Sequence, residues 1–211
     1  GLNQLNLSQV AINKEISVPQ YDRESTEIGI VHLGPGAFHR AHQAFYTENA
    51  MNSSGGNWGI CGVSLRSATA RDVLAKQDNL YTLAILDKNI SYQVIGAIKE
   101  VLVASEQTND VITRMSAAST KLITLTITEK GYCLAADGSL DLNHSDIKHD
   151  LANPSAPVSA IGFIVEALKL RKLNSINAFN VLSCDNVSGN GDKLRRAVLD
   201  YAEQFDVNLK D

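Results

Sequence analysis

Short apolar runs alternate along the chain with segments of helical periodicity. Strands are expected at residues 28–33, 58–65, 121–128 and 178–183. Apolar residues at helical spacing predict helices at residues 40–51, 106–117 and 161–168, and a closing helix from residue 194. This order predicts an α/β fold, a doubly wound and mostly parallel sheet with helices on both faces.

Two further features surround this pattern. Apolar runs at residues 80–86 and 90–95 are separated by Asp87-Lys88-Asn89, which is favourable turn chemistry, so a small β-hairpin is expected beside the sheet. Residues 1–27 are polar and lack clear periodicity. We therefore expect an N-terminal arm over residues 1–27 and one domain over residues 28–211.

Composition narrows the range of partners. The chain has 211 residues, is 44% hydrophobic and carries a net charge of -4, which allows a packed core and disfavours nucleic acid or an anionic membrane as partner. A small molecule is the expected partner. Three widely spaced cysteines form no C-x-x-C pair, so we expect neither disulfides nor a metal site, and a reducing, cytoplasmic location.

The first strand ends in a glycine turn, Gly34-Pro35-Gly36, followed by Ala37 and Phe38. Glycines at this point allow a diphosphate to approach the backbone, and the next helix offers free N–H groups to the anion. His39 stands where the dinucleotide fingerprint has its third glycine, so an ordinary strand-to-helix turn is an equal alternative. We interpret His39 and His42 as packing groups rather than metal ligands.

The end of the second strand bears on the phosphate state of a dinucleotide. An acidic side chain there would bond the adenosine ribose of NAD, but none is cleanly placed. Arg66 and Arg71, without a close acid, would suit a 2′-phosphate, although surface arginines are commoner. NADP therefore stays open beside NAD.

The last two strands end in polar clusters. Thr128 and Glu129 follow one strand, and Asn186 follows the other, at the edge where a nicotinamide ring and a substrate would lie. Asn186 could donate to a carbonyl oxygen that gains negative charge. Turn formation and helix capping are the alternative roles, and they suit Asn190 at least as well as chemistry does.

Four segments together resemble the mannitol dehydrogenase family of polyol-specific long-chain dehydrogenases. They are residues 34–43, 126–133, 147–151 and 183–186. The resemblance runs from about Ile28 to the end of the chain, and the stretch from residue 130 to 163 is most similar to the fructuronate reductase branch.

The resemblance implies a Rossmann-type domain that binds NAD(H) in an oxidoreductase acting on CH–OH groups. It implies cofactor contacts by Gly34, Gly36, Ala37 and Phe38, and an oxyanion-side amide from Asn186. We add Arg66, Thr128 and Glu129 as cofactor-site candidates from their strand-end positions. The favoured pair of substrates is D-mannonate and D-fructuronate, and mannitol or arabinitol 2-dehydrogenase is the alternative.

The same resemblance implies a helical C-terminal domain that carries the catalytic lysine, and no such segment lies within these residues. The chain alone is then expected to be inactive, with that domain as its partner. A binding-only dinucleotide module is the alternative of another class. Many relatives carry an acid near Ala68 or Thr69, so its absence here weakens an assignment to NAD alone.

Overall fold

A computed structural model describes residues 2–205. Its main sheet has five parallel strands in the order β6-β3-β2-β7-β8. These strands are β2 (Ile28–Leu33), β3 (Gly59–Ser64), β6 (Ile98–Val103), β7 (Leu122–Leu125) and β8 (Asn180–Ser183). The order reverses beside β2, so the loops after β2 and β7 leave toward opposite faces, and a ligand crevice is expected between them. The predicted α/β, doubly wound parallel sheet is confirmed.

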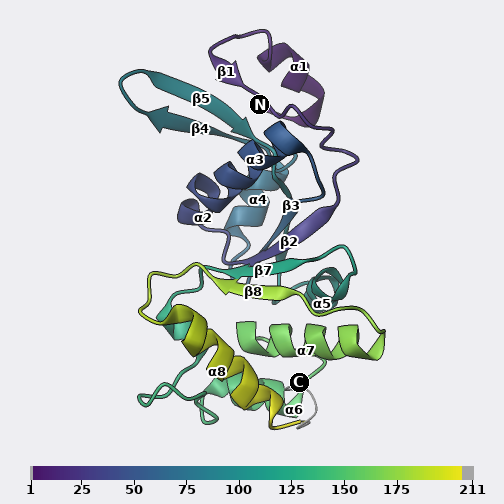
Figure 1. Cartoon of the computed structure of the whole chain (residues 1–211), viewed down its shortest axis with the longest axis vertical. Coiled ribbons are helices and arrows are strands. Elements are labelled where there is room, and N and C mark those ends of the chain that lie inside the picture. Colours follow the sequence, from purple (N-terminus) through teal and green to yellow (C-terminus); the bar gives the residue numbers. More distant parts are fainter. Residues whose placement is uncertain (1, 206–211) are drawn as a thin grey trace.

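Helices cover both faces of this sheet (Figure 1). One face carries α2 (Ala37–Ala41), α3 (Gln43–Ser54) and α4 (Thr69–Ala75). The other carries α5 (Thr108–Ser116), α7 (Ala160–Leu173) and α8 (Asn190–Ala202), with the short α6 (Ser145–Ala152) at the edge of that layer. None of the helices within residues 2–205 has the length and apolar character that a membrane crossing requires.

Side chains along β2 alternate between the two faces of the sheet, and the core is divided into two clusters accordingly. Ile30 packs with Met51 and Ile98 under α3 and α4, while Val31 and Leu33 face the helices of the other layer. All six residues of β2 are buried, because a central strand has neighbours on both faces. This explains why the strand reads as a continuous apolar run.

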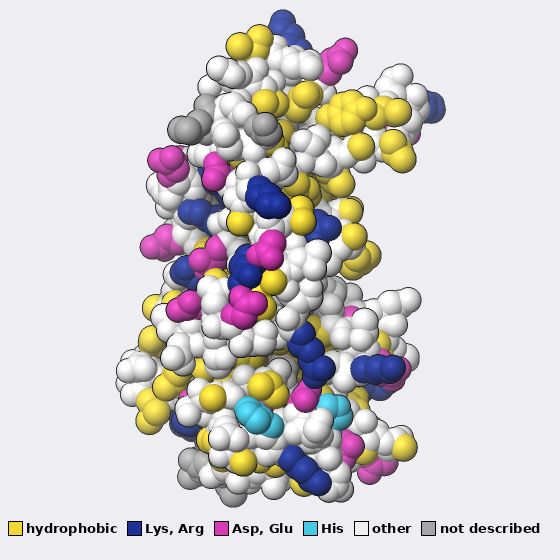
Figure 2. Space-filling view, turned by 180° about the vertical axis from the view of Figure 1, so that it is seen from behind, with side chains coloured by type: hydrophobic (Ala, Val, Ile, Leu, Met, Phe, Trp, Pro, Cys, Tyr) yellow, Lys and Arg dark blue, Asp and Glu magenta, His cyan; other side chains and the backbone are white. Residues whose placement is uncertain are grey.

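The hairpin of β4 (Tyr81–Leu86) and β5 (Ile90–Ile95) is antiparallel, as expected. It does not extend the main sheet, but joins β1 (Ile16–Ser17) in a separate three-stranded sheet. Its outer end leaves Leu86 and Ile90 79% and 61% exposed. Figure 2 shows hydrophobic side chains gathered on this projecting part.

The N-terminal arm contains η1 (Gln4–Asn6), α1 (Leu7–Val10) and β1. It is anchored by Arg23, whose guanidinium donates to the carbonyls of Gly96, Ile98 and Asp78. The Tyr21 hydroxyl donates to the buried Glu48 carboxylate at 2.8 Å, and burial raises the pKa of Glu48. The arm is thus tied to the domain by buried polar contacts.

Candidate functional site

Gly34 is a glycine because the fold requires one. Its φ of +93° lies in the left-handed region, and a Cβ atom there would stand 2.2 Å from the carbonyl oxygen of Thr126. The Gly34 N–H donates to the carbonyl of Val63 at 2.9 Å, which holds the end of β2 against β3. This glycine therefore serves the close approach of β2 and β7, whether or not a ligand binds.

Gly36 has no such requirement. Its φ of -76° is ordinary, and a Cβ atom would meet only the Gly34 carbonyl oxygen, at 3.9 Å. Gly36 is the N-cap of α2 without a side-chain cap, and the backbone N–H groups of Ala37 and Phe38 have no acceptor among the described residues. A bound phosphate uses open space and free N–H donors at the same point.

We call residues 34–38 the glycine turn, and the cavity beside it the glycine cavity. The glycine cavity has a volume of about 710 Å³. Its lining is Gly34, Pro35, Gly36, Arg40, Ser64, Leu65, Ser67, Thr69, Ala70, Val73, Leu74, Gln77, Tyr81, Thr82 and Thr126. Arg40 is the single charged residue of that lining, so the cavity offers one cation, several hydroxyls and apolar wall to a ligand.

Arg40 is held at the turn from two sides. Its Nη1 donates to the carbonyl oxygen of Pro35 at 3.0 Å, and its own carbonyl accepts from the Tyr81 hydroxyl at 2.5 Å. Burial raises the pKa of Tyr81 above its usual value, so this hydroxyl stays a neutral donor. The positive side chain of Arg40 is thereby held at the Pro35 carbonyl in the lining of the glycine cavity, where it favours an anion.

The residue at the third fingerprint position has a packing role. His39 is buried and stacks on His32, with ring centroids 3.5 Å apart, and its Nε2 lies 2.8 Å from the Gln43 amide oxygen. Burial lowers the pKa of His39 to about 4, so the pair is neutral at pH 7. His42 stacks on Phe38 at a centroid distance of 5.1 Å.

The expectation that Arg66 and Arg71 lack a close acid is wrong. Arg66 Nη2 lies 2.6 Å from Asp146 Oδ2, and Arg71 contacts both Asp72 and Glu106. Asp72 directly follows Arg71, but Glu106 is 35 residues away from Arg71 and Asp146 is 80 residues away from Arg66, so no local pattern shows these two acids. Arg66 does not line the glycine cavity but a second one, of about 470 Å³.

Thr128 and Glu129 also lie away from the glycine cavity. Thr128 lines the second cavity with Arg66, and it has a φ of +64°. Asp185 fixes that backbone, because its carboxylate accepts from the N–H groups of Ile127 and Thr128 at 3.1 and 2.9 Å. Glu129 is exposed, lines a third cavity and lies 3.6 Å from Lys193. Leu65 connects the first two cavities, since it lines both.

Asn186 comes directly after Asp185 and is exposed, and its amide has no hydrogen-bond partner within residues 2–205. Asn190 has a structural role instead. Its Nδ2 donates to the carbonyls of Ser183 and Asp185, at 3.3 and 2.9 Å. Asn190 is the first residue of α8 rather than its cap, which is Gly189.

Sequence reasoning missed several residues of the glycine cavity. Thr126 could have been found, because it ends the predicted strand next to β2, and its hydroxyl donates to the Gly34 carbonyl at 2.8 Å. Tyr81 and Thr82 come from the hairpin, whose position over the cavity depends on tertiary packing. No local signal places them there.

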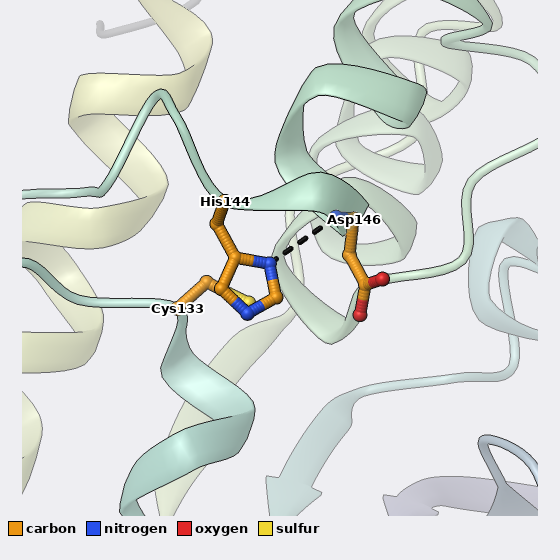
Figure 3. Close-up of side chains that lie close together, drawn as sticks. All are labelled: Cys133, His144 and Asp146. Atoms are coloured by element: carbon orange, nitrogen blue, oxygen red, sulfur yellow. Dashed lines mark hydrogen bonds between the residues drawn. The ribbon is translucent and has the colours of Figure 1, made fainter.

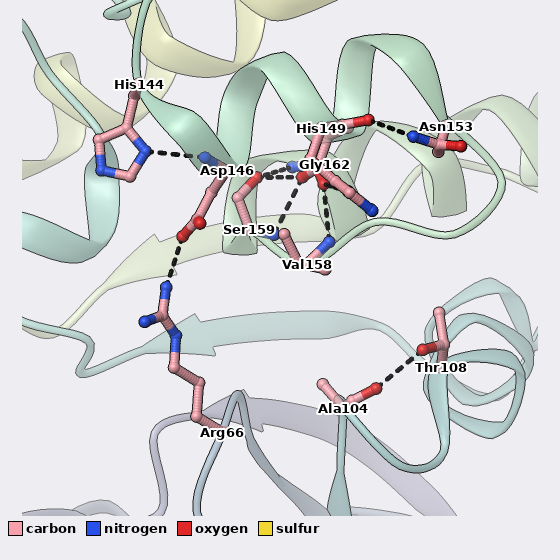
Figure 4. A network of polar contacts seen from close by, with 11 residues as sticks. Arg66, Ala104, Thr108, His144, Asp146, His149, Asn153, Val158, Ser159 and Gly162 are labelled. Carbon is pink, nitrogen blue, oxygen red and sulfur yellow. Dashed lines mark hydrogen bonds and ion pairs between the residues drawn. The ribbon is translucent and has the colours of Figure 1, made fainter.

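We call residues 144–162 the Asp150 loop. The fully buried carboxylate of Asp150 accepts from the N–H groups of Val158 and Ser159 at 2.8 and 2.9 Å, and from the Ser159 hydroxyl at 2.5 Å. The Ser159 hydroxyl in turn accepts from the Gly162 N–H and caps α7 (Figure 4). A Cβ atom at Gly162 would lie 2.2 Å from Asp150 Oδ2. The polar groups of this network are therefore hydrogen-bonded to one another within the protein.

Comparison with known proteins settles the family. The family model described as the mannitol dehydrogenase Rossmann domain matches residues 28–211. This chain belongs to the mannitol dehydrogenase family. It is 46% identical to D-mannonate oxidoreductase of Escherichia coli K12, over 93% of this chain and 42% of that protein. It is 39% identical to mannitol 2-dehydrogenase of Cereibacter sphaeroides, over 94% of this chain and 42% of that protein.

A solved structure of the mannitol dehydrogenase family gives the same result for the fold. The chain matches the ternary complex of Pseudomonas fluorescens mannitol 2-dehydrogenase with NAD and D-mannitol, with a TM-score of 0.92 and 42% identity. The match covers 100% of this chain and 44% of that one. The chain thus spans less than half the length of these relatives.

Proposed function

We propose that this chain is the dinucleotide-binding part of an NAD-dependent oxidoreductase that interconverts a polyol or a hexonate with its keto form. The observation that carries the proposal is Gly36. Neither the backbone conformation nor the packing requires a glycine at position 36. Gly36 precedes the free N–H groups and lines the same cavity as Arg40, where the strand order of the Rossmann-type sheet reverses. Known relatives include a mannitol 2-dehydrogenase solved with NAD and D-mannitol.

In this proposal the glycine turn holds the pyrophosphate of NAD. Ala37 and Phe38 supply N–H donors, Arg40 supplies positive charge, and Gly36 leaves room for the phosphate oxygens. Thr128 and Arg66 line the adjoining cavity and bound the rest of the cofactor, and Glu129 lines the third cavity next to it. When bound, the nicotinamide ring accepts or donates the hydride.

Asn186 is proposed as the amide that faces the reacting oxygen. Its side chain is exposed at the carboxyl end of β8 and has no partner among the described residues, so it is available to a substrate. An amide N–H that donates to an oxygen gaining negative charge stabilises the transition state. The general base is proposed to come from a helical segment outside these residues, in keeping with the greater length of the relatives.

For the substrate we favour the D-mannonate and D-fructuronate pair, because the D-mannonate oxidoreductase of E. coli shares 46% of the aligned residues. Mannitol or arabinitol is the alternative, supported by several mannitol 2-dehydrogenases at 37–40% identity. We place the protein in the reducing cytosol, in keeping with its three free cysteines.

The test uses a full-length protein that contains this chain. D-Fructuronate, D-fructose and D-mannitol are each offered with the matching form of the nicotinamide cofactor, and its absorbance is followed. Faster turnover of D-fructuronate than of D-fructose and D-mannitol supports the favoured pair of substrates. Faster turnover of D-fructose and D-mannitol supports the alternative. Tight cofactor binding without turnover in any arm would indicate the binding-only module, and absence of both would contradict the proposal.

A further inference from the structure

Cys133, His144 and Asp146 lie together at the edge of the second cavity (Figure 3). Cys133 follows the 3-10 helix η2 (Glu129–Tyr132), His144 is the N-cap of α6 and Asp146 lies in its first turn. The sulfur, an imidazole nitrogen and a carboxylate oxygen are all within 4.8 Å of one another. The three ligand types meet only through folding, because the cysteine and the helix come from separate segments.

Asp146 and Cys133 keep ligand atoms that no described group occupies, and the ligand atom of His144 is held by a single backbone N–H. Asp146 accepts from Arg66 through Oδ2 and leaves Oδ1 free. In the neutral His144 ring, Nδ1 carries the lone pair, which accepts the Asp146 N–H at 3.2 Å, and Nε2 carries the proton. The Cys133 thiol makes only a 3.9 Å contact with the Gly131 carbonyl. One thiol, one imidazole and one carboxylate are thus available at a single point.

The local charge favours a cation. Three carboxylates, those of Asp141, Asp146 and Asp150, act electrostatically on Cys133, against the single guanidinium of Arg66. Lys130 lines the two adjoining cavities, and the nearby Lys193 is paired with Glu129. A site with an excess of carboxylates attracts a positive ion.

The cluster is also accessible. Cys133, although only 5% exposed, and His144 line both the second cavity and the third, of about 470 and 490 Å³, so solvent-filled space adjoins both residues. Cys133 itself has a φ of +53°, a left-handed conformation that is uncommon for a residue with a side chain. Such backbone positions are concentrated at functional sites.

We propose that Cys133, His144 and Asp146 bind a divalent transition-metal ion of the zinc class, with water from the cavities as the fourth ligand. Zinc takes sulfur, nitrogen and oxygen ligands in tetrahedral geometry, with the ligand atoms roughly 3.3–3.8 Å apart. The ligand atoms lie within 4.8 Å of one another, so they must approach by up to roughly 1–1.5 Å to reach this spacing. As the sulfur–zinc bond forms, the thiol proton leaves to solvent, and His144 exchanges its bond to the Asp146 N–H for the metal.

The site was not expected from the sequence, because the three cysteines stand apart from one another. Its position gives it a consequence for the cofactor crevice. Asp146 is shared between the metal site and the Arg66 ion pair, so an ion that draws the carboxylate inward loosens Arg66 from its partner. The proposal does not depend on the oxidoreductase function.

The test titrates zinc into the reduced, metal-free chain in competition with a chromogenic chelator. Cobalt(II) then serves as a spectroscopic probe, because a thiolate ligand adds a charge-transfer band in the near ultraviolet. We expect one ion per chain and the thiolate band. Cys133→Ser and His144→Gln are each expected to weaken zinc binding by roughly tenfold or more, and Cys133→Ser to abolish the band.

Cys184→Ser is the matched control, because Cys184 is half-buried directly after β8 and outside the cluster. It is expected to leave zinc affinity and the cobalt band unchanged. Thermal unfolding of each metal-free variant shows that it is folded, so a loss of binding reports on the ligand. Absence of stoichiometric binding by the wild type, or binding that survives both cluster substitutions, would overturn the proposal.

Discussion

The glycine turn and the Asp150 loop both carry segments that resemble the mannitol dehydrogenase family, but they use polar groups in opposite ways. In the glycine turn, the N–H groups of Ala37 and Phe38 have no described acceptor, Arg40 lines the glycine cavity, and Gly36 leaves open space. In the Asp150 loop, the buried carboxylate accepts four hydrogen bonds from protein groups. Sequence resemblance therefore accompanies the proposed dinucleotide site at the glycine turn and a structural role at Asp150.

This difference shows how a binding role can be separated from a structural one. A group whose partners are all within the protein is explained by the fold. A polar group without a partner in the protein, or a glycine that neither backbone conformation nor packing requires, is instead a candidate for contact with a ligand. Substitutions in the two regions should therefore separate stability from binding.

The largest effect is expected for Asp150→Ala. Its loss leaves the N–H groups of Val158 and Ser159 buried without an acceptor, which we expect to lower the free energy of unfolding by about 3–5 kcal/mol. Asp146→Asn, in the same helix, breaks an ion pair whose Arg66 side chain is 77% exposed and should cost about 0–1 kcal/mol. Urea unfolding measures both. Equal stability of the two variants would contradict the structural role of Asp150.

The next effect is a pH dependence that comes from His39. Its folded-state pKa of about 4 lies below the unfolded value of 6.5, so the unfolded chain binds more protons between these values. The neutral form contributes stability above about pH 6.5 that is lost as pH falls toward 4, by about 3 kcal/mol. His39→Gln should reduce the slope of the urea-midpoint profile in this window, and the stacked His32, whose pKa burial also lowers, supplies the slope that is left. An unchanged slope would show that His39 is not the group responsible.

The two glycines of the turn provide a matched pair. Gly34→Ala forces a Cβ atom against the Thr126 carbonyl at a positive φ and should lower the free energy of unfolding by about 2–3 kcal/mol. Gly36→Ala meets open space at an ordinary φ and should change it by no more than about 0.5 kcal/mol. Thermal unfolding distinguishes them. Similar destabilisation by Gly34→Ala and Gly36→Ala would contradict the claim that the fold does not require a glycine at position 36.

The smallest effect on the folded state is expected for Asn186→Ala. The exposed amide has no described partner, so the free energy of unfolding should change by less than about 0.5 kcal/mol. In a full-length protein we expect kcat to fall by about 10²–10³, because an oxyanion donor is lost. A large loss of stability, or an unchanged kcat, would contradict its proposed role.

Local pattern predicted much of the fold. The apolar run at β2 and the helical spacing of α7 and α8 are strong signals because each lies in the core. The sequence reading missed β6, α4 and α6. The alternation in β6 is broken by Lys99 and Glu100, and α4 and α6 are only seven and eight residues long. Short helices depend on tertiary packing more than on their own periodicity.

The part of the candidate site that contiguous residues form could be predicted from the sequence, and the parts that distant segments form together could not. The glycine turn could be identified because strand, turn and helix are contiguous. The ion pair of Arg66 with Asp146, the hairpin wall at Tyr81 and the cluster at Cys133 join segments that are distant in the sequence. Nothing in the local residue order encodes those contacts.

The most direct measurement is calorimetric titration of NADH and NADPH into the wild-type chain and into Gly36→Val and Asn186→Ala, with unfolding curves for each. The account predicts binding to the wild type and to Asn186→Ala, and a loss of at least about tenfold in affinity for a folded Gly36→Val, because a branched side chain fills the phosphate position. Undiminished binding to a folded Gly36→Val would contradict the claim that the glycine turn holds the dinucleotide.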